Sequence, residues 1–356
     1  MWCADCEAIQ RYFFDDTRFF FFVPTLETKA KLEKLFTSLD FDHQILDSHC
    51  ITAICDHSRV EMLLMGVFGE FNGPEQSNTK ITTTPGTMQL DYDAIGRLIS
   101  ADVFINRYKS IWIVDSVEQN RYESWFQPII YAADALKDNP RIFAHEALFR
   151  IRDADDTIIP PGYVFSVADK SDLLFSLDLT ARRSAIEHAA VANLNSKVFV
   201  NFDPSSIYDP SYCLRSTAAA IAKAGLKASD VVFEVTETHK VRNMAHLKGV
   251  LNFYRNAGFR VALDDVGAGW SGLNLLNELM PDFAKIDMEL IRDIDTLPSK
   301  QKIVKHLIAG AKENGIKIIA EGIETLEEAR CLAEFGPDYL QGYLYGRPEL
   351  KGSLNK

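Results

Sequence analysis

The stretch "FRVALDDVGAGWSGL", residues 259–273, decides the fold. Residues 259–263 have the apolar character of a buried strand, and two acids, Asp264 and Asp265, follow directly. Adjacent residues of a regular strand point to opposite faces, so both acids can reach one side only where the strand breaks. The Gly-Ala-Gly that comes next permits the unusual backbone angles of such a break. We therefore expect a core strand that ends where two carboxylates meet.

Segments of this kind recur regularly over residues 121–356. Eight short apolar runs alternate with amphipathic stretches: "WFQPII", "HEALFRI", "KVFVNF", "DVVFEVTE", "FRVALDD", "FAKID", "IKIIAEG" and "YLQGYLY". Eight strands interleaved with helices favour an α/β fold, a (β/α)₈ barrel of the TIM type. A doubly wound open sheet is the alternative, and it would require a glycine-rich phosphate loop after the first strand. No such loop follows that strand.

Residues 1–120 have a different pattern and predict a smaller α+β domain ahead of the barrel. The expected elements are a strand at 18–24, a helix at 25–39, strands within 43–56, a loop at 72–87 and a helical connector at 92–116. A regulatory, sensor or dimerisation role for this domain rests on its position before a barrel alone. On the same basis we expect a homodimer.

The charge of the chain limits its partners. With 38 basic and 50 acidic residues, the formal net charge is −12. Such a surface repels polyanions, so we expect no DNA or RNA polymer as partner, whereas a small anionic ligand held through metal ions is compatible. The densest apolar run, residues 19–23, has the length of a strand, so we expect no membrane span. The N-terminus lacks the pattern of a signal peptide, which indicates a cytoplasmic protein.

Two pairs of cysteines form a second candidate site. Cys3 and Cys6 have the spacing of a zinc or redox pair, and Cys50 and Cys55 are candidates to complete a four-thiolate site. Small buried or incidental cysteines are the alternative.

Polar residues lie inside or at the ends of most of the apolar runs. They are Glu146, Asn201, Glu234, Glu237, Asp264, Asp265, Lys285, Asp287, Glu321 and Gln341. One acid at a strand end is usually a helix cap or a solvated loop residue. Acids from five strands would converge on one mouth of the barrel, and burying them together without cations is very costly. Carboxylate and amide oxygens suit Mg²⁺ or Mn²⁺, and two such ions ~3.5–4 Å apart are the usual arrangement for phosphodiester hydrolysis.

These runs resemble the EAL-domain family, the cyclic-di-GMP phosphodiesterases of bacteria. The motif that names the family is Glu146-Ala147-Leu148 in "HEALFR". The resemblance continues in family order through "FQPII", "VFVNF", "FEVTET", "ALDDVGAG", "AKIDMEL", "IAEGIET" and "LQGYLYGRP", from about residue 122 to 350. It implies that the first barrel strand runs antiparallel to its neighbours.

The resemblance also implies a role for each polar position. Metal ligands would be Glu146, Asn201, Glu234 and Asp264 at the first ion, and Asp264, Asp265 and Glu321 at the second. The catalytic group would comprise Lys285 beside the attacking water, Glu321, and Glu237, which holds the loop after the fifth strand. Arg150 would contact the substrate, with Asp287 and Gln341 in support. Three of these residues also have explanations without a functional role. Arg150 would form an ion pair with Asp153 or another acid, Lys285 would be a solvated lysine at a strand end, and Gln341 would be an amide at the edge of the core.

The implied reaction is hydrolysis of cyclic-di-GMP to linear pGpG by a water bound between two Mg²⁺ or Mn²⁺ ions. Either Lys285 or Glu321 would act as general base, and two dications beside Lys285 would lower its pKa. Ca²⁺, which prefers longer bonds and more ligands, is expected to support substrate binding but inhibit turnover. Two other functions stay open: an inactive EAL-type receptor that signals through residues 1–120, and a barrel enzyme for another phosphate ester.

The chain departs from the family in the loop after the paired acids. The family usually has Asp-Asp-Phe-Gly-Thr-Gly-Tyr-Ser-Ser, whereas residues 264–272 read Asp-Asp-Val-Gly-Ala-Gly-Trp-Ser-Gly. The missing phenyl ring and hydroxyl remove packing and hydrogen bonds, so we expect this loop to hold Asp265 less firmly. Trp270 in place of the missing anchor is the alternative. A looser loop would weaken the second metal more than substrate binding.

Overall fold

The computed structural model describes residues 12–204, 207, 210–236, 244–268 and 272–350. Its contacts divide the chain into two compact units. The first joins Met1–Asn120 with Asp153–Leu177, and the second joins Arg121–Arg152 with Asp178–Lys356. The chain therefore leaves the first unit after residue 120 and returns to it between residues 153 and 177.

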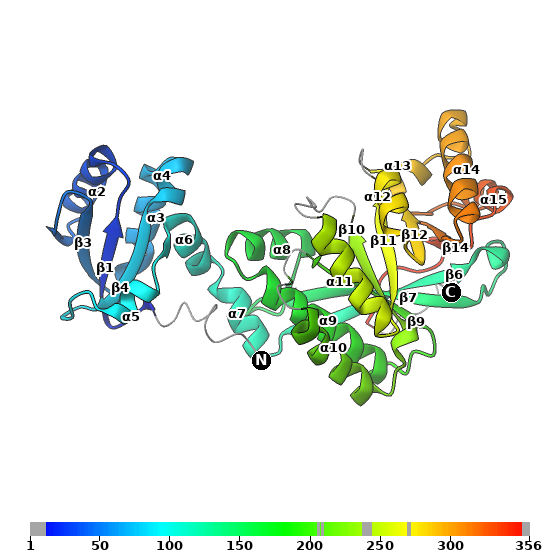
Figure 1. Cartoon of the computed structure of the whole chain (residues 1–356), viewed down its shortest axis with the longest axis horizontal. Coiled ribbons are helices and arrows are strands. Elements are labelled where there is room, and N and C mark those ends of the chain that lie inside the picture. Colours follow the sequence, from blue (N-terminus) through cyan, green and yellow to red (C-terminus); the bar gives the residue numbers. More distant parts are fainter. Residues whose placement is uncertain (1–11, 205–206, 208–209, 237–243, 269–271, 351–356) are drawn as a thin grey trace. The chain divides into compact units, whose positions relative to one another are not determined.

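The first unit contains a five-stranded antiparallel sheet in the order β2-β3-β1-β4-β5. Its strands are β1 (Asp16–Phe22), β2 (Asp42–Ile45), β3 (Cys50–Asp56), β4 (Lys80–Pro85) and β5 (Ile99–Ser100). Its helices are α2 (Leu26–Ser38), η2 (His57–Arg59), α3 (Val60–Glu70), α4 (Gly73–Asn78), α5 (Tyr92–Gly96), α6 (Ala101–Lys109), α7 (Ile111–Glu118) and α8 (Pro161–Lys170). Figure 1 shows strands β1, β3 and β4 beside helices α2 and α3.

The core of the first unit is aromatic. Phe19 and Phe21 on one face of β1 pack with Phe36 of α2 and Phe104 of α6, and all four side chains are buried. The order of elements β1-α2-β2-β3-α3-β4, with β1 and β3 in the centre of the sheet, is that of a ferredoxin-like α+β unit. The predicted strand at 18–24, helix at 25–39 and strands within 43–56 are confirmed.

The predicted loop at 72–87 is wrong, because this stretch contains α4 and the strand β4, which lies between β1 and β5. Asn72 caps α4, and Glu75 bonds back to the Asn72 backbone in a capping box. Pro74, which indicated a loop, occupies the first turn of the helix, where proline is tolerated. The threonines of "KITTTP" suit a strand because they are β-branched, and β4 pairs with β1 along its length. The helical connector at 92–116 contains α5, α6 and α7, interrupted by β5.

Segment 153–177 joins the first unit through a buried arginine. Arg107 of α6 donates from Nε to the carbonyl of Ser171 at 3.1 Å and from Nη2 to Asp172 Oδ2 at 2.8 Å. Trp112 of α7 stacks on Tyr163 of α8 with an angle of 7° between the rings. This segment also contains the two-residue strand β8 (Ile158–Ile159).

The second unit is a closed barrel of eight strands, as predicted. They are β6 (Tyr122–Tyr131), β7 (Ile142–Arg152), β9 (Lys197–Asn201), β10 (Val231–Thr236), β11 (Arg260–Val266), β12 (Phe283–Ile286), β13 (Lys317–Ala320) and β14 (Tyr339–Gln341). Strands β7 and β9 to β14 are parallel in sequence order, and β6 closes the barrel by pairing antiparallel with both β14 and β7. The expected antiparallel first strand is therefore confirmed.

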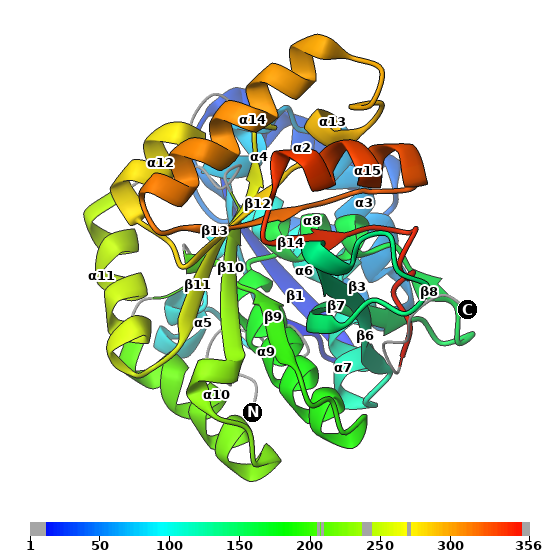
Figure 2. The same cartoon turned by 90° about the vertical axis from the view of Figure 1, so that its right-hand side faces the viewer.

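Helices surround the barrel strands in Figure 2. They are η3 (Ala132–Asp134), α9 (Leu174–Val191), α10 (Pro210–Ala224), η5 (Ala228–Asp230), α11 (Met244–Asn256), α12 (Gly272–Leu279), α13 (Met288–Ile291), α14 (Pro298–Glu313) and α15 (Leu326–Phe335). Within the part of the chain that the structure describes, no helix is long and apolar enough to cross a membrane.

An apolar layer fills the barrel below its mouth, with one residue from each of seven strands. The layer contains Ile129, Ala144, Phe199, Val232, Ala262, Phe283 and Ile319, with Phe143 and Tyr339 packed against it. Side chains two residues apart on a strand share a face. The inward-facing residues two positions nearer the mouth therefore form the next layer.

The positions of Cys50 and Cys55 contradict the hypothesis that they complete a four-thiolate site. Cys50 and Cys55 lie at opposite ends of β3, opposite Phe22 and Thr17 of β1. Because a strand rises about 3.3 Å per residue, one ion cannot bind both thiolates. Burial raises the pKa of Cys50 to about 11 and that of Cys55 to about 12, so both stay protonated thiols. Cys3 and Cys6 lie outside the described residues.

Candidate active site

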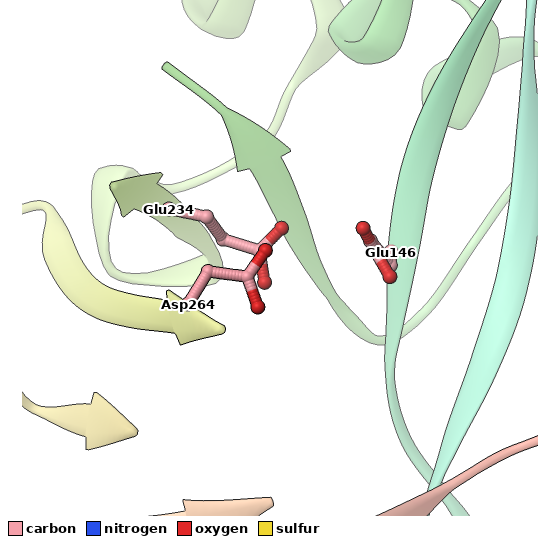
Figure 3. Close-up of side chains that lie close together, drawn as sticks. All are labelled: Glu146, Glu234 and Asp264. Carbon is pink, nitrogen blue, oxygen red and sulfur yellow. The ribbon is translucent and has the colours of Figure 1, made fainter. Parts of the chain in front are cut away.

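A ring of polar side chains lies directly above the apolar layer, and each barrel strand supplies one. In strand order the ring consists of Gln127, Glu146, Asn201, Glu234, Asp264, Lys285, Glu321 and Gln341. Seven of them lie two residues from a member of the apolar layer on the same strand or its direct extension, and Gln341 lies two residues from Tyr339, which packs against that layer. Figure 3 shows three of the acids, with Glu234 and Asp264 facing the space opposite Glu146.

Lys285 stands at the centre of the ring. Its Nζ lies 2.6 Å from Glu321 Oε1, 2.9 Å from Glu234 Oε1, 3.3 Å from Asp264 Oδ1 and 3.4 Å from Glu146 Oε2. Only 1% of the lysine is exposed. The alternative of a solvated lysine is therefore wrong, and the structure brings together the four acids predicted to meet there.

The four carboxylates outnumber the one ammonium group, and burial makes this excess costly. Burial raises the pKa of Glu234 and Glu321 well above the usual range, and it raises that of Asp264. Burial alone would lower the pKa of Lys285, but the surrounding carboxylates outweigh it and raise this pKa well above its usual value. The lower pKa of Lys285 that the sequence predicts applies to a site that holds two divalent cations, whereas the raised pKa is that of the metal-free protein.

Two groups of acids are spaced to hold a metal ion. Oxygens of Glu146, Glu234 and Asp264 lie within 4.8 Å of one another, and so do oxygens of Asp264, Asp265 and Glu321. Asp264 belongs to both groups, as expected for a bridging ligand. Within the described structure, the buried Oε2 of Glu234 and Oε1 of Gln341 have no hydrogen-bond partner. These orphaned oxygens, together with the acids, form a donor set that fits divalent cations.

The backbone shows how two adjacent acids reach the same mouth. The pairing of β11 with β12 shifts register between Leu263 and Val266. Asp265 itself has φ 57°, a left-handed conformation, and one of its carboxylate oxygens lies within 4.8 Å of one of Asp264. The backbone thus turns at Asp265 itself, two residues before the first glycine, and β11 continues to Val266.

The first glycine after the acids has a steric role. Gly267 has φ 104°, and a Cβ there would lie 2.3 Å from Leu290 Cδ1. Val266 is buried at the end of β11, whereas Gly269 and Trp270 lie outside the described residues. The reduced restraint of this loop therefore stays a prediction.

A chain of amides holds Glu146 from the other side. Gln341 Nε2 donates to Glu146 Oε2 at 2.6 Å and to Gln127 Oε1 at 3.2 Å. Gln127 Nε2 donates in turn to the carbonyl of Gly346 at 3.1 Å. Asn201 Nδ2 lies 3.4 Å from Glu146 Oε1. Gln127 was not among the predicted site residues; the available signal was a polar residue inside the apolar run "WFQPII".

Arg150 lies beyond the ring on β7. It donates from Nη1 to the carbonyl of Phe149 at 2.9 Å, and its Cζ lies 5.3 Å from the centre of the Trp125 ring. Asp287, predicted to support the site, caps α13 by accepting from the backbone of Glu289 at 2.7 Å. Burial raises the pKa of Asp265 to about 6, and the charges of Asp264 and Asp287 add to this effect. Glu237 lies outside the described residues.

A family model described as EAL domain matches residues 112–348 of the chain. The chain belongs to the EAL domain family. The match includes the whole barrel and every residue of the polar ring.

Relatives of this EAL domain protein share about the same span. Signaling protein YkoW of Bacillus subtilis is 28% identical over 239 residues, which is 66% of this chain and 29% of the relative. Cyclic di-GMP phosphodiesterase PdeF of Escherichia coli K12 is 28% identical over 216 residues, 60% of this chain and 29% of the relative. The chain thus spans about a third or less of these relatives.

Solved EAL structures resemble the barrel. The c-di-GMP-bound standalone versatile EAL protein from Vibrio cholerae O395 is 32% identical, with a TM-score of 0.58. The likeness covers 66% of this chain and 95% of that one.

Proposed function

We propose that the barrel is a metal-dependent phosphodiesterase that hydrolyses cyclic-di-GMP to linear pGpG. The observation that carries the proposal is the polar ring, in which the predicted ligand acids converge around Lys285. Relatives named cyclic di-GMP phosphodiesterases and a relative solved with c-di-GMP support the choice of substrate. A receptor without activity is less well supported, because no ligand position in the ring has lost its polar group.

The residues divide into two sites for Mg²⁺ or Mn²⁺. Glu146, Asn201, Glu234 and Asp264 would hold one ion, and Asp264, Asp265 and Glu321 the other. When bound, two such ions activate water and stabilise charge on an in-line displacement at phosphorus. Lys285, 2.6 Å from Glu321 Oε1, would hold or move a proton between that carboxylate and the attacking water. Arg150 would contact the substrate. The site would be supported by Glu237, which holds the loop after the fifth strand, and by Asp287 and Gln341. Ca²⁺ would bind without supporting turnover.

Replacing Glu146 by alanine tests the metal site. Glu146 offers oxygens to the first ion and accepts from Gln341, so we expect Glu146→Ala to abolish release of pGpG in Mg²⁺ or Mn²⁺. The fold should survive, because losing one of several crowded carboxylates relieves repulsion in the metal-free protein. The measurements are product analysis by chromatography and thermal unfolding. Wild-type turnover in a folded Glu146→Ala protein would refute this assignment.

We also propose that residues 1–120 regulate or dimerise the enzyme, in a cytoplasmic homodimer. The support is that residues 153–177, which follow β7 directly, belong to the same compact unit as residues 1–120. The molar mass in solution, measured by light scattering with and without cyclic-di-GMP, tests the dimer. A monomer at all concentrations would exclude it.

A further inference from the structure

The hairpin of β6 and β7 extends its inward face beyond the polar ring. The register places Gln127 opposite Glu146, then Trp125 opposite Leu148. Because alternate residues share a face, Trp125 lies on the same face as Gln127, one step of about 7 Å farther out. Arg150 follows on β7, diagonal to Trp125. This face therefore borders the mouth on which the carboxylates converge.

The indole of Trp125 is fixed at its polar edge. Its Nε1 donates to Glu123 Oε1 at 2.7 Å, and the same oxygen accepts from Arg152 Nη2 at 2.7 Å. The guanidinium carbon of Arg150 lies 5.3 Å from the ring centre, in the range of a cation–π contact. Trp125 is only partly buried. The ring and the guanidinium thus form a preset pair, and both are partly open to solvent.

A second pair of an arginine and an aromatic ring follows β14, the strand next to β6. The guanidinium carbon of Arg347 lies 4.3 Å from the centre of the Tyr343 ring, and Tyr343 is 43% exposed. Metal-bound phosphate chemistry needs no aromatic groups, whereas recognition of unpaired bases uses aromatic rings and arginine planes for stacking.

We propose that Trp125 is the specificity-determining residue on which a purine base of the substrate stacks, with Arg150 beside it. The N–H groups of the guanidinium suit the O6 and N7 acceptors of guanine. The inference rests on the proposed function, and it assigns the base-recognition surface to a residue outside the metal centre.

The test compares two phosphodiesters in Trp125→Leu, Trp125→Phe and Trp112→Leu proteins. Cyclic-di-GMP has bases, and bis(p-nitrophenyl) phosphate has none, so the ratio of their kcat/KM values reports base recognition. We expect Trp125→Leu to lower this ratio about tenfold or more, mainly through the KM for cyclic-di-GMP, because stacking on one base is lost. Trp125→Phe should keep most of the ratio. Trp112, stacked on Tyr163 in the first unit, is the matched control and should leave it unchanged.

Equilibrium binding of cyclic-di-GMP in Ca²⁺, measured by calorimetry, completes the test. We expect Trp125→Leu to bind about tenfold or more weakly than wild type, and Trp125→Phe to bind nearly as well. Wild-type binding by Trp125→Leu, or equal loss with both phosphodiesters, would overturn the inference. A wild-type protein that binds cyclic-di-GMP but does not hydrolyse it would refute the proposed function and leave this binding comparison to decide on Trp125.

Discussion

Asp265 occupies a backbone conformation that few residues adopt without strain. Its φ of 57° is left-handed, and asparagine and aspartate tolerate that region better than most residues. The sequence shows that the two acids must face the same side for both to bind metal, but not which residue absorbs the turn. In the structure Asp265 takes the turn, and Gly267, two residues on, lies so close to Leu290 that it has no room for a side chain, a contact that local sequence does not contain.

The protonation of Asp265 makes metal binding depend on pH. Burial, with the charges of Asp264 and Asp287, raises its pKa from 3.8 to about 6 in the metal-free protein. A cation must displace this proton, so the affinity for Mg²⁺ should fall as the pH drops below about 6, by up to about tenfold per pH unit. Calorimetric titration with Mg²⁺ between pH 5 and pH 8 measures it. A flat profile would contradict the raised pKa.

Asp265→Asn supplies the control for this prediction. A carboxyl whose pKa is raised on folding contributes stability that is present below the unfolded pKa and lost as the pH rises through the folded pKa. In EDTA at pH 7.5, Asp265→Asn should therefore be more stable than wild type by about 1–2 kcal/mol after allowance for solvent screening. At pH 3, below the unfolded pKa of 3.8, the two proteins should have nearly the same free energy of unfolding. If wild type had the higher free energy of unfolding at pH 7.5, the ionised Asp265 carboxylate would not destabilise the folded protein.

At the scale of elements, the seven parallel barrel strands could be predicted because each combines an apolar run with a polar residue two positions after an inward-facing one. Gln127 was missed because β6 runs antiparallel, so its polar residue stands before the apolar layer instead of after it. The helix and strand within 72–87 were missed because proline, glycine and asparagine also occur at the first turns of helices.

Gln127→Leu tests whether this amide positions the metal ligand. The substitution removes the acceptor for Gln341 and the donor to Gly346, so Gln341 should hold Glu146 less firmly. Loss of such an outer partner typically costs 10–100-fold in metal affinity or activity. We expect weaker binding of Mn²⁺ by calorimetry together with a lower kcat. Gln44→Leu, on the exposed edge strand β2, is the control and should change neither quantity. Unaltered Mn²⁺ binding in Gln127→Leu would exclude a positioning role.

At the scale of the whole molecule, the chain passes between its two compact units after residues 120, 152 and 177. Composition indicates a change of domain near residue 120, but it does not reveal that residues 153–177 pack with the first unit. The contacts responsible join residues more than 60 positions apart, such as Arg107 with Ser171 (64 positions) and with Asp172 (65 positions). Only the folded chain brings them together.

Arg107→Ala tests whether this arginine holds residues 153–177 in the first unit. The substitution leaves the buried Ser171 carbonyl without its charged donor, which should lower the free energy of unfolding of the first unit by about 1–3 kcal/mol. Limited proteolysis with mass mapping should show faster cleavage within residues 153–177. Arg330→Ala removes an exposed ion pair with Glu327 and should have almost no effect. Equal proteolysis of both variants would mean that Arg107 does not anchor the segment.

The most direct test of the proposed reaction is hydrolysis of cyclic-di-GMP by the wild-type protein in water enriched in ¹⁸O. Attack by an activated water predicts pGpG carrying one ¹⁸O in its terminal phosphate, formed in Mg²⁺ or Mn²⁺, suppressed by Ca²⁺ and absent in EDTA. Mass spectrometry of the product reports both identity and label. Tight binding of cyclic-di-GMP with no pGpG in any of these metals, or turnover that continues undiminished in EDTA, would contradict a metal-dependent phosphodiesterase.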